Sequence, residues 1–158
     1  CDSLQPLLLF GFRKHGSVLD IGAGGGFPSV PINIFRPDLK MILSESNKKK
    51  SSFLNEVKQV VELENIEVFP DRCEKLEGRK YDYVVSRGYA SLGNFSQTAK
   101  NFIFDDGRMY TFKAKKFAEE LEQITSNRQK DRVKISEIAE YDLANQIQGL
   151  NLVSLSLC

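Results

Sequence analysis

The sequence predicts an α/β fold: a doubly wound, mostly parallel sheet with an antiparallel edge. Short apolar segments alternate with helical patterns over most of the chain, and a cluster of glycines directly follows the first apolar segment. The last two apolar segments follow one another without a helical pattern between them. Strands that alternate with helices form parallel sheets, whereas consecutive strands pair antiparallel. We expect a single domain over residues 1–158, without internal repeats or linkers.

The first half of the chain supplies three strands and two helices. Val18–Ile21 is an apolar strand, and a helix follows to about Phe35 because Pro28 and Pro31 suit a first helical turn. The next strand is Met41–Leu43. Ser46 and Asn47 offer a cap for a helix from about Lys48 to Leu63, in which apolar residues recur at helical spacing. Ile66–Phe69 is the third strand, and a turn or short helix is expected over Asp71–Leu76.

The second half continues the alternation and then closes the sheet. We expect, in order, a buried strand Tyr81–Ser86, a helix Ala90–Phe104, a tight turn at Asp105-Asp106-Gly107, a strand Arg108–Phe112 and a charged helix from Ala114 to about Asn127. Val133–Leu143 and Leu150–Leu157 show the alternation of an antiparallel pair.

Composition excludes several classes of protein. The chain has 41% hydrophobic residues, 27% charged residues and a net charge of +1, which is typical of a soluble globular domain. No apolar run approaches the ~20 residues of a membrane span. The three cysteines lie far apart without a CxxC spacing, which fits a cytoplasmic protein and neither a disulfide framework nor a metal site. The chain begins with Cys1, and we interpret its start as truncated.

Four glycines in five positions, Gly22 and Gly24 to Gly26, indicate a ligand-binding turn between the first strand and the following helix. Gly22 and Gly24 permit backbone angles forbidden to other residues, and Gly25 and Gly26 keep side chains out of the ligand's path. A dinucleotide fingerprint requires glycine at the position of Phe27, and Phe27 with Pro28 would obstruct a pyrophosphate. S-adenosylmethionine (AdoMet), which has no pyrophosphate, suits the turn better.

Two acidic residues support a nucleoside ligand. Glu45 ends the second strand about 20 residues after the glycines, where a carboxylate accepts hydrogen bonds from both ribose hydroxyls of a nucleotide. This position fits a dinucleotide as well as AdoMet. Asp20 lies within an apolar strand and must have a partner, either the ligand's amino group or the turn itself.

The sequence resembles the glucose-inhibited division protein B family, which are bacterial 16S rRNA guanine-N7 methyltransferases. The resemblance is carried by "DIGAGGGFPSVPINIFRP", "ESNKKKSSFLNEV", "LENIEVFPDRCEKL" and "YDYVVSRGYASL", and it runs from about Asp2 to Lys113. It implies a class I AdoMet-dependent methyltransferase (Rossmann-like) fold and AdoMet as cofactor. Most of the family's N-terminal helical segment is absent here, "FKA" replaces the family's "LKG", and the C-terminus lacks a basic tail.

The resemblance also implies the site. The family's cofactor contacts fall on Gly22, Phe27, Glu45, Ser46, Asn47, Cys73, Glu74 and Arg87. Cys73 and Glu74 follow the third strand, where they would hold the adenine, although Cys73 is also explained as a buried structural thiol. Arg87 is the catalytic candidate: it either contacts the guanine or a phosphate, or it forms an ion pair with Glu74 or Glu45.

The residue types agree with methylation of guanine N7, which has a lone pair and no proton to remove. The chain has a single histidine and no hydrolase-like arrangement, and this reaction depends mainly on positioning. In A-form RNA, N7 faces a groove that side chains do not enter, so the target base must be exposed or extruded. We expect Lys113 and Lys115, with Lys116, to contact phosphates of the 16S rRNA or small ribosomal subunit.

Two alternatives stay open from the sequence. One is an AdoMet-dependent enzyme that methylates a small molecule or a protein. The other is a non-catalytic nucleotide-binding module that uses NAD.

Overall fold

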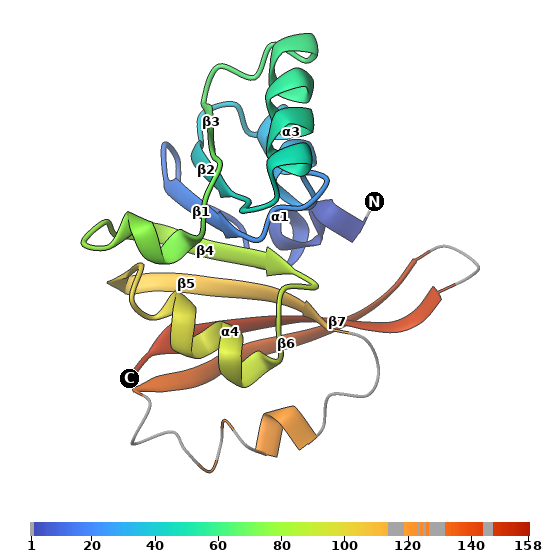
Figure 1. Cartoon of the computed structure of the whole chain (residues 1–158). Coiled ribbons are helices and arrows are strands. Elements are labelled where there is room, and N and C mark those ends of the chain that lie inside the picture. Colours follow the sequence, from blue (N-terminus) through green and yellow to red (C-terminus); the bar gives the residue numbers. More distant parts are fainter. Residues whose placement is uncertain (1, 114–118, 123, 125, 127–131, 144–146) are drawn as a thin grey trace.

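A seven-stranded sheet forms the centre of the computed structural model, and helices cover both of its faces (Figure 1). The structure describes residues 2–113, 119–122, 124, 126, 132–143 and 147–158. The strand order is β3-β2-β1-β4-β5-β7-β6. Strands β1 to β5 run parallel, and β7 lies antiparallel to both β5 and β6. The doubly wound, mostly parallel sheet with an antiparallel edge is therefore confirmed.

The elements have the following bounds, in chain order: η1 Asp2–Leu4, α1 Gln5–Leu9, β1 Ser17–Ile21, α2 Ser29–Phe35, β2 Lys40–Ser44, α3 Lys48–Val60, β3 Ile66–Phe69, η2 Cys73–Leu76, β4 Tyr81–Arg87, α4 Leu92–Ala99, β5 Ile103–Lys113, β6 Val133–Leu143 and β7 Ile147–Leu157. No described helix is long and apolar enough to cross a membrane.

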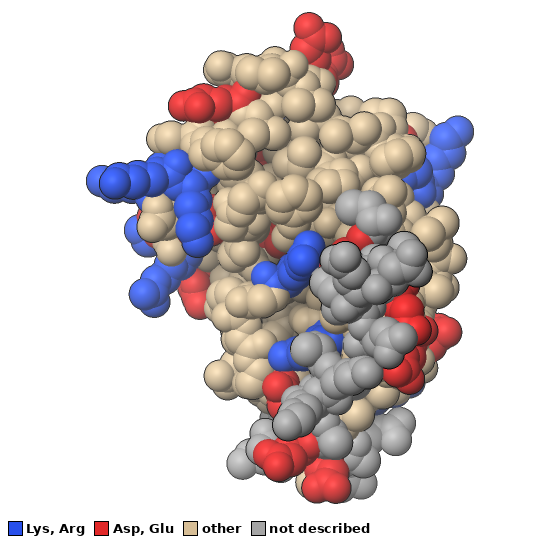
Figure 2. Space-filling view, turned by 90° about the vertical axis from the view of Figure 1, so that its right-hand side faces the viewer, with Lys and Arg blue, Asp and Glu red and all other residues tan. Residues whose placement is uncertain are grey.

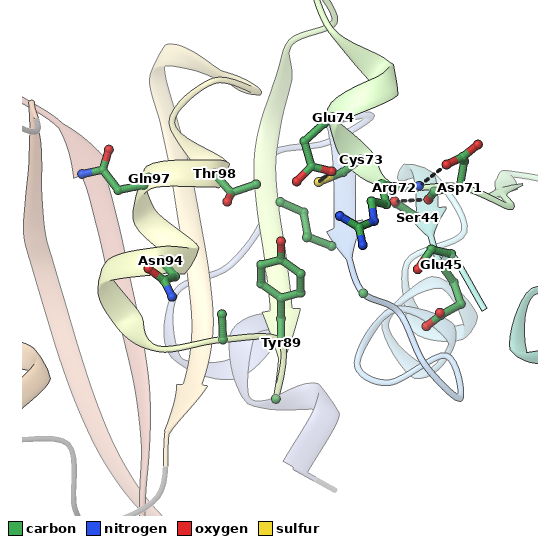
Figure 3. A pocket seen from close by; sticks show the side chains of 15 residues that line it. Ser44, Glu45, Asp71, Arg72, Cys73, Glu74, Tyr89, Asn94, Gln97 and Thr98 are labelled. Atoms are coloured by element: carbon green, nitrogen blue, oxygen red, sulfur yellow. Dashed lines mark hydrogen bonds between the residues drawn. The ribbon is translucent and has the colours of Figure 1, made fainter.

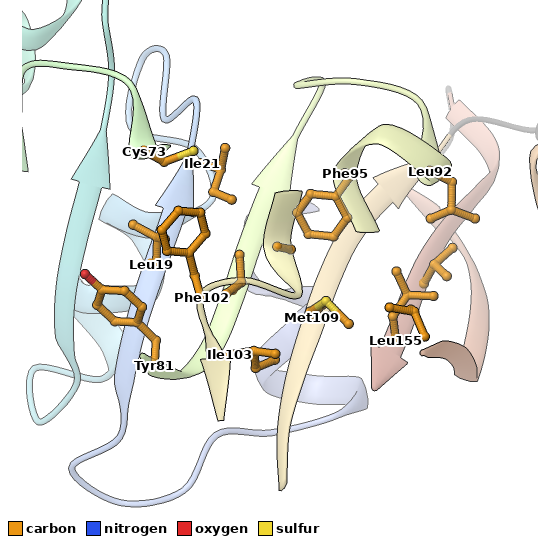
Figure 4. Packing of buried hydrophobic residues seen from close by; sticks show 14 of the residues in the cluster. Leu19, Ile21, Cys73, Tyr81, Leu92, Phe95, Phe102, Ile103, Met109 and Leu155 are labelled. Carbon is orange, nitrogen blue, oxygen red and sulfur yellow. The ribbon is translucent and has the colours of Figure 1, made fainter. Parts of the chain in front are cut away.

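Two hydrophobic clusters lie on the two faces of the sheet. Ile32 of α2 and Leu54 of α3 pack on one face with residues such as Met41. Phe95 of α4 packs on the other face, in one cluster with Met109 (Figure 4). Ile32, Leu54 and Phe95 are almost completely buried in this way, and such burial of apolar surface is the main stabilising contribution to a fold of this kind.

The strand order fixes where a ligand crevice lies. From β1 the chain proceeds through β2 to β3 on one side, and then returns to β4 and β5 on the other side. The order thus reverses between β1 and β4, and open α/β sheets bind ligands at the carboxyl ends of the strands at this point. The glycine turn follows β1 and lies at this edge.

One predicted region is wrong. The expected helix Ala90–Phe104 is shorter, because α4 ends at Ala99, and the expected turn Asp105-Asp106-Gly107 lies inside β5. Between the pairs Tyr81–Ile103 and Tyr83–Arg108, β4 advances by two residues while β5 advances by five. The Asp-Asp-Gly sequence therefore forms an irregularity in a parallel pair, whereas the sequence favoured a tight turn.

The predicted helix from Ala114 to about Asn127 lies partly outside the described residues. Within it, residues 119–122 are helical. The closing antiparallel pair is confirmed, and β7 begins at Ile147, three residues before its predicted start at Leu150.

Candidate active site

A cavity of about 700 Å³ lies at the carboxyl edge of the sheet, beside the glycine turn (Figure 3). Its walls come from the ends of β1 and β2, from the segment after β3, and from the segment that joins β4 to α4. The lining residues are Ile21, Gly22, Ser44, Glu45, Ser46, Asp71, Arg72, Cys73, Glu74, Gly88, Tyr89, Ala90, Asn94, Gln97 and Thr98.

The glycine turn depends on backbone conformations that favour glycine. Gly22, Gly24 and Gly26 have φ values of +72°, +58° and +91°. A Cβ atom at Gly22 would lie 3.0 Å from the Tyr89 ring, and one at Gly26 would lie 2.7 Å from Val30 Cγ2. Gly26 is thus required by the protein's own packing, which differs from the expectation that it clears a path for the ligand.

Glu45 joins the glycine turn to the start of α3. Its Oε2 accepts a hydrogen bond from the Gly24 N–H at 2.9 Å, and its Oε1 accepts one from the Asn47 N–H at 2.8 Å. The residue is 8% exposed and lines the cavity. The carboxylate therefore organises the turn and also faces the space in which a ligand would lie.

Ser46 and Asn47 continue from Glu45 in different roles. Ser46 lines the cavity. Asn47 is not part of the lining; its Oδ1 accepts hydrogen bonds from the backbone N–H groups of Lys49 and Lys50, at 3.0 and 3.2 Å. Asn47 thus caps α3 and acts on the site through the position of Glu45.

Cys73 and Glu74 form the part of the wall that follows β3. The Cys73 thiol is 3.6 Å from Glu74 Oε2 and donates to it. Burial and the Glu74 carboxylate raise the pKa of Cys73 to about 12. The thiol is therefore neutral at ordinary pH and is no nucleophile.

Asp20 lies behind the glycine turn and is fully buried. Its Oδ2 accepts a hydrogen bond from the Ser29 hydroxyl at 2.6 Å, while its Oδ1 has no partner among the described residues. Burial raises the pKa of Asp20 to about 7, with a further contribution from the nearby Glu45 charge, and the Ser29 hydrogen bond opposes the rise. Asp20 thus ties β1 to the start of α2 and does not line the cavity.

Four residues that line the cavity were not predicted from the sequence, namely Arg72, Asn94, Gln97 and Thr98, whereas Tyr89 was a candidate for stacking on the acceptor base. Arg72 and Tyr89 extend toward the middle of the cavity from opposite sides (Figure 3). Burial raises the pKa of the Tyr89 phenol, and a hydrogen bond with Thr98 opposes this. Asn94, Gln97 and Thr98 form a polar stripe on α4, opposite to its buried apolar side. Their helical spacing was the signal in the sequence that could have identified them.

Arg87 and Phe27 lie outside the cavity lining. Arg87 forms an ion pair with Asp2 at 3.2 Å and its side chain is 44% exposed. Of the two alternatives for Arg87, the ion pair therefore exists, but with Asp2 of the N-terminal segment and with neither Glu74 nor Glu45. Phe27 is 51% exposed at the start of α2.

Lys113, one of the two lysines expected to contact phosphates, has its partners within the chain. Lys113 Nζ donates to the Ala90 carbonyl and to Glu120 Oε2, both at 2.9 Å, and its side chain is 11% exposed. It therefore fastens the segment after β4 to the helical residues 119–122. Lys115 lies outside the described residues, as does Lys116.

Comparison with solved structures defines the class of protein. The chain superimposes on the ribosomal protein L11 methylase of Lactobacillus delbrueckii subsp. bulgaricus with a TM-score of 0.75 and 11% identity, covering 98% of this chain and 76% of that one. M. jannaschii TYW2, solved in complex with AdoMet, gives a TM-score of 0.71 and 18% identity, covering 98% and 72%. The fold is that of the class I AdoMet-dependent methyltransferases.

Comparison with protein families identifies a narrower group within this class of proteins. Residues 1–147 match the model of the family described as rRNA small subunit methyltransferase G, and the chain belongs to this family. Curated relatives named ribosomal RNA small subunit methyltransferase G include those of Desulforamulus reducens, 41% identical over 77% of this chain and 53% of the relative, and Chromobacterium violaceum, 38% identical over 70% and 52%. The chain spans about half the length of these relatives.

Proposed function

We propose that the chain forms the AdoMet-binding and catalytic part of an enzyme that methylates N7 of a guanine in 16S rRNA. The observation that supports this most directly is the cavity at the strand-order reversal, where Glu45 fastens the glycine turn and faces the open space. Family membership supports small-subunit rRNA as the substrate class. A ribosomal substrate would place the enzyme in the bacterial cytoplasm.

The lining residues fit AdoMet. Small-molecule sites typically measure ~300–1,000 Å³, so the cavity of about 700 Å³ has room for a nucleoside with an amino-acid tail. Glu45 would accept the ribose hydroxyls, and the backbone at Gly22 would contact the tail. Cys73 and Glu74 would bind the adenine, and Ser46 would complete the ribose side. When bound, AdoMet supplies an activated methyl group on a sulfonium.

The chain's own residues then have to position the acceptor and need no general base. Guanine N7 offers a lone pair, and no proton has to leave it during formation of the C–N bond. The neutral Cys73 thiol and the buried Asp20 are both unsuited to base catalysis at this atom. Positioning alone contributes up to about 7–11 kcal/mol in favourable cases.

Arg87 is the residue that we propose for contact with the guanine or its phosphate. Its side chain is 44% exposed in the ion pair with Asp2, whose own side chain is 13% exposed, so the guanidinium is accessible from outside the chain. An RNA phosphate would take the place of Asp2 as the partner of the guanidinium. Phe27, which is half exposed beside the glycine turn, offers a ring for stacking on the acceptor base.

Methyl transfer to RNA tests the proposal. Radiolabelled AdoMet would be incubated with the chain and with deproteinised 16S rRNA, small subunits, ribosomal proteins or a metabolite extract. We expect label in the RNA or the small subunit, and mapping should locate it at N7 of a guanine. Label confined to protein or metabolites would replace the proposal with a different acceptor. Binding of NAD in place of AdoMet in calorimetry would overturn it.

A further inference from the structure

Three consecutive lysines, Lys48, Lys49 and Lys50, open α3 at the carboxyl edge of the sheet. All three are exposed, and none forms an ion pair with a described residue. Five other cations of the described chain are in ion pairs, among them Lys113 with Glu120 and Arg87 with Asp2, whereas the scattered exposed lysines Lys14, Lys40 and Lys80 are in none of them. The lysine cluster therefore keeps its full charge for a partner outside the chain.

The position of the cluster is unfavourable for the helix itself. The amino end of a helix has a partial positive charge, so cations in the first turn destabilise it. The first turn of α3 contains no acidic residue, and the Asn47 side chain satisfies only the N–H groups of Lys49 and Lys50. The fold thus places three like charges next to one another and next to the positive end of the helix. The Glu45 carboxylate and the Asn47 cap accept N–H groups at this helix end, but no described carboxylate forms an ion pair with the three ammonium groups.

The cluster follows the candidate active site closely in the sequence. Glu45 and Ser46 line the cavity, and Lys48 follows two residues later. Figure 2 shows the molecule from the side toward which β4 points in Figure 1. On this face the basic side chains form separate groups and no continuous band. A ligand that uses these lysines would thus be held at one rim of the cavity.

We propose that Lys48–Lys50 bind backbone phosphates of the substrate RNA and hold the strand at the rim of the cavity. The inference rests on the proposed function, because it requires an RNA acceptor. Phosphates would neutralise the three ammonium groups and relieve their conflict with the amino end of α3. Lysine contacts with phosphates carry no sequence information, so the cluster would position the RNA and leave the choice of base to the cavity.

A triple substitution with a matched control tests the inference. K48Q/K49Q/K50Q removes the cluster. K14Q/K40Q/K80Q removes the same charge from three exposed lysines that lie at or just before the amino ends of β1, β2 and β4, on the opposite edge of the sheet. Filter binding of deproteinised 16S rRNA would be measured between 50 and 200 mM KCl. Calorimetry would give the AdoMet affinity and thermal unfolding the Tm.

For the cluster variant we expect RNA binding at least about tenfold weaker, and a slope of log affinity against log salt that is lower by about 2–3, since each phosphate contact contributes ~0.7–0.9. AdoMet affinity should stay the same, and the Tm should rise by about 2–4 °C because the clash with the helix end is gone. The triple arginine variant K48R/K49R/K50R should keep RNA binding. The control variant should lose less than about threefold.

The outcomes separate the two proposals. RNA binding that is unchanged in the cluster variant, or weakened equally in both triple variants, overturns the role of the cluster and leaves the proposed function standing. A parent protein that binds AdoMet but neither binds nor methylates RNA overturns the proposed function, and the inference with it.

Discussion

The two edges of the sheet differ in how their polar groups find partners. At the amino edge, two arginines and their aspartate partners are paired within the chain, while the exposed Lys14, Lys40 and Lys80 form no ion pair with a described residue. Arg13 contacts both Asp82 and Asp106, at 3.1 and 2.9 Å, and Arg36 holds Asp38 at 2.7 Å. A cavity exists there too, but it is lined by an aromatic cluster whose polar atoms bond to the chain itself.

At the carboxyl edge, pairing is incomplete. Asp20 has a carboxylate oxygen without a partner, Lys48–Lys50 are unpaired among the described residues, and Arg72 extends into the cavity. The named carboxylates of the amino edge thus find partners within the chain, whereas the carboxyl edge holds a buried carboxylate oxygen without a partner among the described residues and a run of three unpaired lysines. Polar groups that have partners within the chain contribute to the stability of the fold. Polar groups without such partners lower that stability, and they therefore indicate where a ligand binds.

The largest expected difference between the edges is in how the free energy of unfolding depends on pH. The contributions of Asp20 and Asp38 to this free energy should change in opposite directions as the pH rises. Burial raises the pKa of Asp20 from 3.8 to about 7, so between these values the native state binds more protons than the unfolded chain. The free energy of unfolding therefore falls as the pH rises through this window, by up to about 4 kcal/mol. Asp20→Asn should remove this fall and stabilise the protein above pH 7.

Asp38 provides the opposite case. The hydrogen bonds from the Arg36 guanidinium and the His15 N–H hold the pKa of Asp38 well below its usual range. Its contribution is present above the unfolded pKa and is lost as the pH falls, so Asp38→Asn should flatten only the acidic side of the profile. Urea unfolding from pH 3 to 8 checks both variants. If the free energy of unfolding changes with pH in the same way for Asp20→Asn and the parent protein, Asp20 is ionised in the native state.

The second difference concerns carboxylates that cross-link the backbone at the two edges. Glu45 accepts two backbone N–H groups, and Asp82 accepts the N–H and the hydroxyl of Ser17. Charge-assisted hydrogen bonds contribute about 1.5–3 kcal/mol, so Glu45→Ala should weaken AdoMet binding by about 10–100-fold. Asp82→Ala should lower stability and leave AdoMet binding intact. Calorimetry and urea unfolding of both variants decide this, and equal losses of AdoMet affinity would mean that Glu45 acts only through the fold.

Many residues of the carboxyl edge were predictable from the sequence because they come shortly after the ends of predicted strands. Gly22 and Glu45 come directly after the first two strands, and Cys73-Glu74 comes shortly after the third. Parallel strands bring their carboxyl ends to one edge, so residues far apart in the sequence are placed together by topology alone. All of them line the cavity.

Other parts required tertiary contacts that no local pattern encodes. The partner of Arg87 is Asp2, which lies near the N-terminus before the first strand. Glu45 and Glu74 are nearer to Arg87 in the sequence but have different partners. The Asp-Asp-Gly sequence in β5 has the composition of a turn, but pairing with β4 keeps it within the strand. Local propensity was overridden there by the pairing of two long strands.

The smallest expected difference is within the carboxyl edge itself, between two neighbouring glycines. At Gly26 a Cβ would lie 2.7 Å from Val30 and the backbone has a positive φ, so Gly26→Ala should lower the free energy of unfolding by about 1–3 kcal/mol. At Gly25 the nearest atom would be Phe27 Cδ2 at 3.9 Å, so Gly25→Ala should leave stability within about 0.5 kcal/mol. If a ligand lies against this turn, Gly25→Ala should nevertheless weaken AdoMet binding severalfold, because its methyl group occupies space that the protein leaves open. Full AdoMet affinity in Gly25→Ala would place the ligand away from this glycine and restrict the close approach to Gly22.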